Sequence, residues 1–256
     1  MGGTFEVGVV LSGGGQGGIE PWQADLNKAM LGAAQEADVC LCVNRWEQRT
    51  LTNQFGIRST WLPNGVDVQA CDQAVGGRFC RRWKVAPGFV LLVGRMDPVK
   101  NPADFVRLAT SMPQQQFVMV GGVTRPDIEQ ELQLPMPHNT RLLPTLSHAE
   151  TLDAVAAAGA IVVTSFREGL PTLVLEAMAM QRQLIVPSEA GCLDATDGDR
   201  HALVYHHGHL EEMQELTLRS LTTPICRQAA RSRILTDFDW NVVAARLDSV
   251  YQGMNS

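Results

Sequence analysis

Residues 164–179 have the sequence TSFREGLPTLVLEAMA and directly follow an apolar run, AIVV, at 160–163. A short apolar run that ends at turn residues is typical of a buried strand. Gly169 indicates a turn, and Pro171 indicates the first residue of a helix, where the N–H that proline lacks would be unpaired in any case. The sequence therefore predicts a strand, a tight loop and a helix in this order.

Two carboxylates lie in this segment, Glu168 in the loop and Glu176 inside the helix, with seven residues between them. At about 1.5 Å of helix rise per residue they are on the order of 10 Å apart, too far to share a proton. The helix start between them offers unpaired N–H groups and the positive end of the helix dipole, which suit a diphosphate. Most isolated pairs of this kind are a solvated loop residue and an exposed helix face. The wider sequence instead favours two contacts to one long ligand, with a sugar at one carboxylate and a ribose at the other.

Strands and helices alternate through the second half of the chain, which predicts an α/β fold with a parallel sheet and helices on both faces. Strands are expected over 89–93, 117–120, 141–143, 160–163 and 184–187, and helices over 102–110, 127–134, 147–157 and 242–251. Ser147 and Glu150 have the spacing of a capping box. Ligands of such sheets bind beyond the carboxyl ends of the strands. We therefore expect the loops after Val93, after Val120 and around Glu168 to share one crevice.

The first part of the chain contains the pattern Gly-x-Gly-x-x-Gly in its glycine-rich segment, residues 12–18, between a possible strand at 5–11 and a helix at 20–36. Dinucleotide binding would require an acidic residue after the next strand, about 20 residues on. That strand, expected at 39–43, ends in Asn44, so nicotinamide binding is not predicted. A flexible loop, or one that closes over an acceptor, is the preferred interpretation of residues 13–18. A helix at 45–55, a strand at 60–62 and a turn at Asn64-Gly65 are expected to lead into an interdomain hinge.

Composition excludes several classes of protein. Hydrophobic residues make up 45% of the chain and charged residues 19%, and the formal net charge is −6, so no basic surface for nucleic acid is expected. No apolar run approaches the roughly 20 residues that span a bilayer, and the N-terminus lacks the basic start of a secretion signal. We expect a cytoplasmic protein without a transmembrane segment, with peripheral membrane contact if its acceptor is a lipid.

Neither the cysteines nor the histidines have the spacing of a metal site. The six cysteines are Cys40, Cys42, Cys71, Cys80, Cys192 and Cys226, and none forms a Cys-x-x-Cys pair. This spacing predicts reduced, structural thiols. The histidine-rich segment 206–209 is expected to be a polar loop, because no second ligand group stands at zinc-like spacing.

Several motifs in order resemble the retaining glycosyltransferases of the large group-1 family (family 4), which use sugar nucleotides and have the two-domain B-type fold. The motifs are LPNGVD at 62–67, VGRMDPVKN at 93–101, VMVGG at 118–122, the two glutamates with seven residues between them, and FDW at 238–240 with Tyr251. The resemblance implies a partial N-terminal, acceptor-side domain over 1–72, a linker over 73–87, and a Rossmann-like, doubly wound C-terminal domain over 88–256 that binds the donor. The last helix would cross back onto the N-terminal domain.

The resemblance also implies roles for individual residues. Arg95, placed after a buried strand by Gly94, and Lys100 would hold the diphosphate, which suits a bidentate guanidinium and a mobile ammonium. Glu168 would contact the transferred sugar and Glu176 the ribose hydroxyls. Further contacts to the donor, a UDP or GDP sugar, would come from backbone at Gly169, Leu170, Pro171, Gly121 and Gly122. No cofactor or metal is expected, because Arg95 and Lys100 supply the positive charge.

The family transfers its sugar with retention, by attack on the face from which the nucleoside diphosphate leaves, so the phosphate itself would take the acceptor proton. Glu168 as a nucleophile is the alternative, but retaining hydrolases need a second carboxyl group about 5 Å away. The acceptor would be a glycan or a lipid-linked group, as in polysaccharide biosynthesis. The loop at 188–191 departs from the family, which usually has two glycines where Ala190 and Gly191 stand.

Only about 70 residues precede the expected linker, whereas the family's N-terminal domain roughly equals the C-terminal one in size. The chain would then be a fragment, would be completed by another polypeptide, or would be inactive. The alternative function is therefore a catalytically incompetent remnant that binds nucleotide sugar. A sugar-nucleotide epimerase of the same fold is a third interpretation, for which no residue pattern is present.

Overall fold

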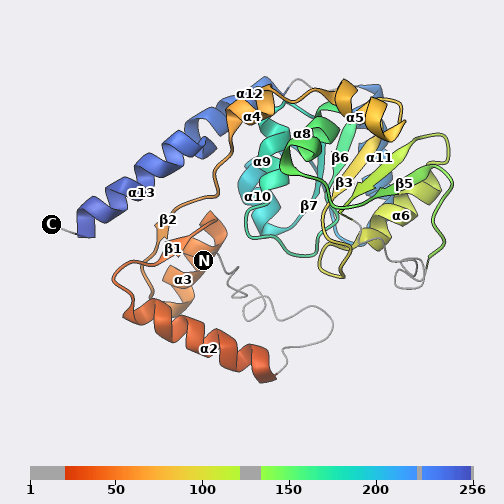
Figure 1. Ribbon diagram of the computed structural model, residues 1–256. Coiled ribbons are helices and arrows are strands. Elements are labelled where there is room, and N and C mark those ends of the chain that lie inside the picture. Colours follow the sequence, from red (N-terminus) through yellow and green to blue (C-terminus); the bar gives the residue numbers. More distant parts are fainter. Residues whose placement is uncertain (1–20, 122–133, 224–226, 255–256) are drawn as a thin grey trace.

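The chain forms two parallel sheets, as seen in a computed structural model that describes residues 21–121, 134–223 and 227–254. One sheet has six strands in the order β5-β4-β3-β6-β7-β8, and the other has the two strands β1-β2 (Figure 1). The expected strand at 5–11, the glycine-rich loop at 13–18 and nearly all of the expected helix at 127–134 lie outside the described residues.

The six-stranded sheet confirms the predicted α/β class. Its strands are β3 (Val90–Val93), β4 (Phe117–Val120), β5 (Thr140–Leu143), β6 (Ala160–Val162), β7 (Leu184–Pro187) and β8 (Leu203–Tyr205). All five pairings are parallel, and Val90 pairs with Phe117 on one side and with Ala160 on the other. The chain runs outward from β3 to β5 and then returns to place β6 beside β3. The order of strands thus reverses between β3 and β6, which is where open α/β sheets bind their ligands.

Side chains of the central strands alternate between two cores, one on each face of the sheet. Leu91, Val118 and Ile161 belong to one core, and Val90, Phe117 and their neighbours belong to the other. A strand buried on both faces needs apolar residues at every position, which explains the continuous apolar runs.

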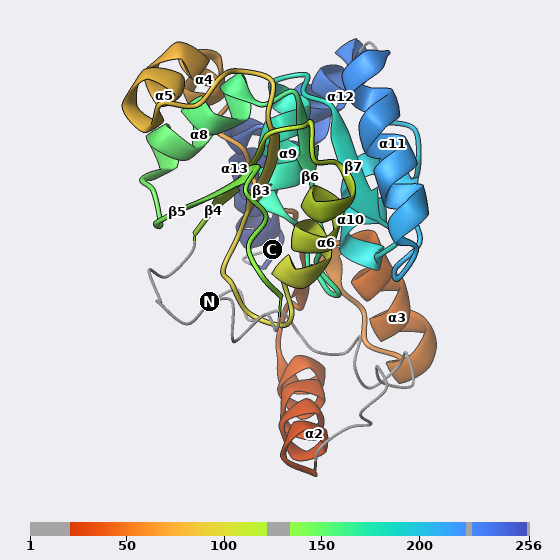
Figure 2. The same ribbon diagram turned by 90° about the vertical axis from the view of Figure 1, so that its right-hand side faces the viewer.

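Helices cover both faces of this sheet. The first core receives α5 (Gly76–Trp83), α8 (His148–Ala157), α9 (Thr172–Ala179) and α10 (Ala190–Thr196), and the second receives α6 (Pro102–Ser111) and α11 (Leu210–Thr222). Figure 2 shows α5 and α8 on one side of the sheet and α11 on the other. The capping box of α8 forms as predicted: Ser147 Oγ accepts from the Glu150 backbone, and the Glu150 side chain accepts from Ser147.

The first part of the chain has its own small core. It comprises α2 (Pro21–Glu36), β1 (Leu41–Cys42), α3 (Arg45–Phe55) and β2 (Thr60–Trp61). Ala34, Cys42, Leu51 and Ile57 form that core. The bounds of α3 are those predicted, because Asn44 caps its start and Gly56 ends it in a left-handed conformation with φ 66°. The strand expected at 39–43 is shorter than predicted.

The range 73–87, predicted as a linker, contains helix α5 and follows another short helix, α4 (Val68–Asp72). Helix α5 packs closely on α8, since a Cβ at Gly76 would lie only 2.7 Å from the backbone nitrogen of Ala157. Asp153 of α8 accepts hydrogen bonds from Val75 N at 2.6 Å and from Arg78 Nε at 2.7 Å. This segment is therefore fixed to the helical layer of the larger sheet, and the domain boundaries at 72 and 87 stay predictions.

The C-terminal segment joins the two sheets. After α12 (Gln228–Arg233) comes a single turn of π-helix, η1 (Ile234–Phe238), and then α13 (Trp240–Met254), longer at both ends than the predicted helix. Val66 pairs with Asp239, and the Trp240 indole lies so close to Gly65 that any side chain there would overlap it. The far end of α13 lines a groove with Asp38, Val39 and Thr60, the first residue of β2.

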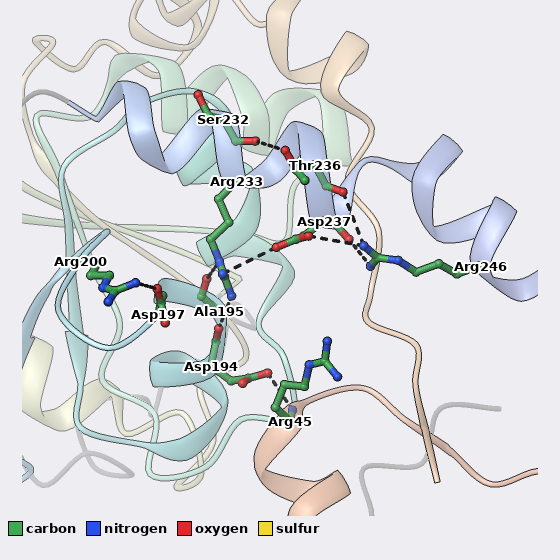
Figure 3. Close-up of polar contacts among 10 residues, drawn as sticks. All are labelled: Arg45, Asp194, Ala195, Asp197, Arg200, Ser232, Arg233, Thr236, Asp237 and Arg246. Atoms are coloured by element: carbon green, nitrogen blue, oxygen red, sulfur yellow. Dashed lines mark hydrogen bonds and ion pairs between the residues drawn. The ribbon is translucent and has the colours of Figure 1, made fainter.

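A network of arginines ties these elements together (Figure 3). Arg246 of α13 donates to the carbonyl of Asp237 at 2.7 Å, and Arg233 lies 3.7 Å from the Asp237 carboxylate. Arg233 also donates to the carbonyls of α10, and Asp194 of α10 accepts from the backbone of Arg45 at 2.8 Å. The guanidinium groups of Arg45 and Arg246 lie 3.9 and 4.7 Å from the centre of the Trp61 ring, an arrangement that cation–π attraction favours.

Substitution of Asp153 tests whether α5 is fixed in this way. We expect Asp153→Ala to lower the free energy of unfolding by about 1–3 kcal/mol, because the Val75 N–H and the Arg78 guanidinium lose a charged acceptor. Burial raises the pKa of Asp153, but the bonds from Arg78 and Val75 outweigh burial and leave that pKa lowered. Because the pKa of Asp153 is lower in the folded state, its carboxylate stabilises the fold at pH values above its unfolded-state pKa of about 3.9. This stabilisation is lost as the pH falls through the folded-state pKa.

Urea unfolding of the wild type and of Asp153→Ala at pH 7 and at pH 3 measures the free energy of unfolding. The difference in this free energy between the two proteins should be smaller at pH 3. Arg78→Ala serves as the control, with a smaller loss expected because Arg78 is half exposed. Equal stability of wild type and Asp153→Ala at pH 7 would contradict the packing described.

Candidate functional site

A cavity of about 410 Å³ opens at the carboxyl ends of β3 and β6, where the strand order reverses. Residues from the loop after β3, the loop after β6, and helices α8 and α9 line it. The lining residues are Asn64, Leu92, Val93, Gly94, Lys100, His148, Thr151, Val162, Val163, Thr164, Ser165, Glu168, Leu170, Pro171, Thr172, Leu173 and Glu176. Of the sequence-predicted site residues, the structure brings six together here: Gly94, Lys100, Glu168, Leu170, Pro171 and Glu176.

Hydrogen bonds join the loop after β3 to the loop after β6. Thr164 Oγ1 donates to the carbonyl of Lys100 at 2.8 Å, and Phe166 N donates to the carbonyl of Val99 at 2.8 Å. Lys100 is further held by its own N–H, which donates to Asp97 Oδ1 at 3.0 Å. The two loops therefore form one unit, and Lys100 and Glu168 are held on facing sides of it.

Lys100 and Glu168 form an ion pair inside the cavity, with 2.6 Å between Nζ and Oε1. The Glu168 side chain is only 11% exposed, so the ammonium offsets much of the cost of burying its charge. The lysine stem is flexible, and its ammonium is a compact charge that can move. An anionic ligand entering the cavity would compete with Glu168 for this cation.

Glu176 has a cationic or hydrogen-bonding partner of its own in His148, with 2.6 Å between Oε1 and Nε2. Sequence reasoning identified Glu176 but not His148. The local signal was present, because His148 directly follows the helix cap Ser147 and its position is therefore fixed. The sequence does not encode that α8 and α9 lie on the same face of the sheet, where the two side chains meet.

The start of α9 faces the same cavity. Thr172 and Leu173, the first two residues of α9, line the cavity, and the first N–H groups of a helix have no acceptor within it. Pro171 was predicted as the first helical residue and is instead the N-cap, with no side-chain oxygen to cap the helix. The helix start between the two glutamates therefore faces the cavity without a side-chain cap, and the binding of an anion there stays a prediction.

Other predicted residues lie elsewhere. Three predicted residues that the structure describes do not line the cavity: Arg95, Gly169 and Gly121. The Arg95 side chain is 78% exposed, and its Nε lies 3.0 Å from Oδ2 of Asp97. Gly121 has φ 103°, and a side chain there would overlap the carbonyl of Gly94. Gly122 lies outside the described residues.

Two asparagines from the first part of the chain hold the Glu168 loop. Asn44 Nδ2 donates to the carbonyl of Gly169 at 2.7 Å, and Asn64 Nδ2 donates to the carbonyl of Leu170 at 2.8 Å. Asn44 is buried and also caps α3, since its Oδ1 accepts from Glu47 N at 2.7 Å. The sequence marks Asn44 as a strand end and Asn64 as a turn residue, but contacts across more than 100 residues leave no local pattern.

The segment at 188–191 differs from the predicted loop because α10 begins at Ala190. Glu189 caps this helix by accepting from Gly191 N at 2.9 Å and Cys192 N at 3.1 Å. Burial raises the pKa of Glu189, although these backbone bonds oppose the shift. The backbone N–H groups that a phosphate could use at this point already have a carboxylate as their acceptor.

The cysteines and histidines outside the cavity have structural surroundings. The five described cysteines are free thiols, and burial raises the pKa of Cys42 and of Cys71 to about 12, so both stay protonated at neutral pH. In the segment 206–209, His206 bonds to Glu212, and the His207 ring lies 5.4 Å from that of Phe166. Within the described ranges, no group of three or more His, Cys, Asp or Glu residues is arranged to hold a metal ion.

Comparison with known proteins gives one family and several relatives. The family described as glycosyl transferases group 1 matches residues 87–223, more than half of the chain. A glycogen synthase of Mycobacterium tuberculosis is 26% identical over 230 residues, which cover 85% of this chain and 54% of the relative. A GDP-mannose-dependent monoacylated alpha-(1-6)-phosphatidylinositol monomannoside mannosyltransferase of Corynebacterium glutamicum is 23% identical over 241 residues, with 85% and 62% covered. The chain spans about half the length of the curated relatives it matches.

Solved structures show the same fold. Sucrose-phosphate synthase from Thermosynechococcus elongatus superposes with a TM-score of 0.81 at 20% identity, covering 98% of this chain and 66% of that protein. HepE of Anabaena, solved in complex with UDP-glucose, gives 0.77 at 16% identity, covering 88% and 67%. The Rossmann-like architecture predicted from the sequence is therefore confirmed.

Asn44→Asp tests the contact that holds the Glu168 loop. The variant keeps an oxygen to cap α3 but loses the N–H that binds the Gly169 carbonyl. We expect a local loss of about 1 kcal/mol, roughly a fivefold faster hydrogen exchange of the amides in residues 167–170. Exposed Asn53 of α3 offers a matched control, Asn53→Asp. Unchanged exchange in Asn44→Asp, measured by mass spectrometry, would show that the loop does not depend on Asn44.

Proposed function

Because this chain belongs to the glycosyl transferases of group 1, we propose that it moves a hexosyl group from a nucleoside-diphosphate sugar to a hydroxyl group of an acceptor. The observation that carries the proposal is the cavity at the point where the strand order reverses. Two nearly buried carboxylates, Glu168 and Glu176, line it on either side of an open helix start. Its volume of about 410 Å³ lies within the range of roughly 300–1,000 Å³ usual for small-molecule sites.

The transferred sugar, the diphosphate and the ribose of the donor each have a counterpart in this cavity. Glu168 would contact the transferred sugar, the start of α9 would bind the diphosphate, and Glu176 would accept hydrogen bonds from the ribose hydroxyls. Lys100 lies beside Glu168 and would move toward the phosphates as negative charge develops on the leaving group. Gly121 and Gly122 would border the nucleobase.

The similar proteins support either a uridine or a guanosine nucleotide as part of the donor. HepE was solved with UDP-glucose, and the Corynebacterium relative is named as GDP-mannose-dependent. That relative is also named as acting on a phosphatidylinositol monomannoside, which supports a glycan or lipid-linked acceptor for this chain. Among the described residues, no helix is both long and apolar enough to cross a membrane.

The proposed transfer proceeds with retention of configuration. The bond from the anomeric carbon to the phosphate oxygen breaks, the acceptor oxygen bonds to that carbon from the same face, and the acceptor proton passes to the departing phosphate. The titratable side chains lining the cavity among the described residues are Lys100, His148, Glu168 and Glu176. Both carboxylates already have partners, so neither is poised as a free base. This pairing of the carboxylates supports the departing phosphate as the acceptor of the proton.

Binding of nucleotide sugar without transfer is the second candidate. Glu189 accepts from Gly191 N and Cys192 N, so these N–H groups could not stabilise the negative charge that develops on a leaving phosphate, which favours loss of transfer.

Calorimetric titration with UDP and GDP tests the donor site. We expect one of the nucleotides to bind the wild-type chain and to bind Lys100→Ala and Glu176→Ala about tenfold more weakly, since each variant loses a charged hydrogen-bonding group. Arg95→Ala should weaken binding as well if the guanidinium leaves Asp97 for the diphosphate. Arg107→Ala is its matched control, because Arg107 is likewise exposed and paired with an aspartate.

A hydrolysis assay with the matching nucleotide sugar then separates the two candidates. Release of sugar by the wild type supports transfer, whereas binding without release supports the binding-only function. A wild-type chain that bound neither nucleotide would contradict both.

A further inference from the structure

We propose that His148 is a positioning residue that holds Glu176 in the orientation that receives ribose hydroxyls. It would thereby give the site its preference for ribonucleotides over nucleotides without these hydroxyls. This inference rests on the proposed nucleotide-sugar site and assigns a role to a residue that the donor-binding motifs do not include. His148 acts through Glu176 and not on the reacting atoms.

The geometry of the pair supports this role. His148 Nε2 lies 2.6 Å from Glu176 Oε1, and both residues line the cavity. The Glu176 side chain is only 13% exposed, whereas the His148 side chain is 62% exposed, so a largely buried carboxylate is paired with a ring that reaches the solvent. A carboxylate offers about four lone-pair sites, so one bond from His148 leaves sites for two hydroxyl donors.

Both residues of the pair belong to helices. His148 is the first residue of α8 and lies between the two residues of the capping box, Ser147 and Glu150. Glu176 lies within α9 between Leu175 and Ala177, which are fully buried. Fixed backbones leave only side-chain torsions to order on binding, which lowers the entropic cost of recognition.

The His148–Glu176 pair differs from a surface ion pair of the same chain, His206–Glu212. His206 and Glu212 lie 3.2 Å apart at the loop after β8, and neither lines the cavity described above; their side chains are 70% and 33% exposed. Exposed pairs of this kind contribute little. The His148–Glu176 pair is shorter, its carboxylate is largely buried, and it faces an open cavity.

The tautomer of His148 follows from its acceptor. A carboxylate accepts hydrogen bonds, so Nε2 must carry the proton. An imidazole can donate from Nε2 both when neutral and when protonated. The effect of His148 therefore does not require a charged ring, and it should be measurable at pH 8.

The test compares UDP or GDP, whichever binds the wild type, with its 2′,3′-dideoxy analogue by calorimetry at pH 8. We expect His148→Ala to weaken the ribonucleotide about five- to tenfold and to change the affinity for the analogue by less than about twofold, because only hydroxyl contacts depend on Glu176. His148→Gln should retain most of the affinity, since its amide can donate from near the position of Nε2. His148→Asn, whose amide matches Nδ1 instead, should behave as His148→Ala does.

His206→Ala is the matched control and should leave both affinities unchanged. An unaltered ribonucleotide affinity in His148→Ala would overturn the inference, and so would an equal loss for both ligands, because the histidine would then act on something other than the ribose. If the wild type bound neither UDP nor GDP, the proposed function would fail and the inference with it. The wild-type titration thus separates failure of the function from failure of the inference.

Discussion

The pairing of β3 with β6 is the constraint on which the site depends. These two strands are far apart in the sequence but adjacent in the sheet, and their parallel pairing brings two loops to the same edge. The backbone and side-chain bonds from Thr164 and Phe166 to the loop after β3 then fix Lys100 opposite Glu168. Since β6 leads through a tight loop into α9, the same pairing also places Glu176 and the open start of α9 at the cavity.

A second constraint comes from the segment around residue 64, which touches three parts of the molecule. Asn64 holds the carbonyl of Leu170, while Val66 accepts from Trp240 N at 3.1 Å and donates to the carbonyl of Phe238 at 2.7 Å. The start of α13 is in turn tied to α10 and α3 through the arginines of Figure 3. The position of the Glu168 loop is therefore coupled, through one short segment, to the C-terminal helix and to the smaller sheet.

The sequence predicted what depends on local patterns. The strands at 117–120 and 184–187 and the helix at 45–55 have the predicted bounds, because each is a continuous apolar run or a segment with clear caps. Lys100, Glu168 and Glu176 fall in one cavity because strand ends in a parallel sheet share an edge. Their roles toward a ligand stay predictions.

What the sequence did not predict depends on packing between distant elements. Helix α5 begins with two glycines, which disfavour a helix, yet contact with α8 and the bonds to Asp153 stabilise it. His148 meets Glu176 across 28 residues because α8 and α9 lie on the same face of the sheet. The direction of the long Arg95 side chain is likewise set by a neighbour, Asp97, and not by its position after a buried strand.

A crystal structure of the chain with the bound nucleoside diphosphate would decide where the ligand lies. We expect the nucleotide in the cavity between β3 and β6, with its diphosphate at the start of α9 and its ribose hydroxyls on Glu176. Nucleotide bound at another surface, or in this cavity with its ribose turned away from Glu176, would contradict this expectation.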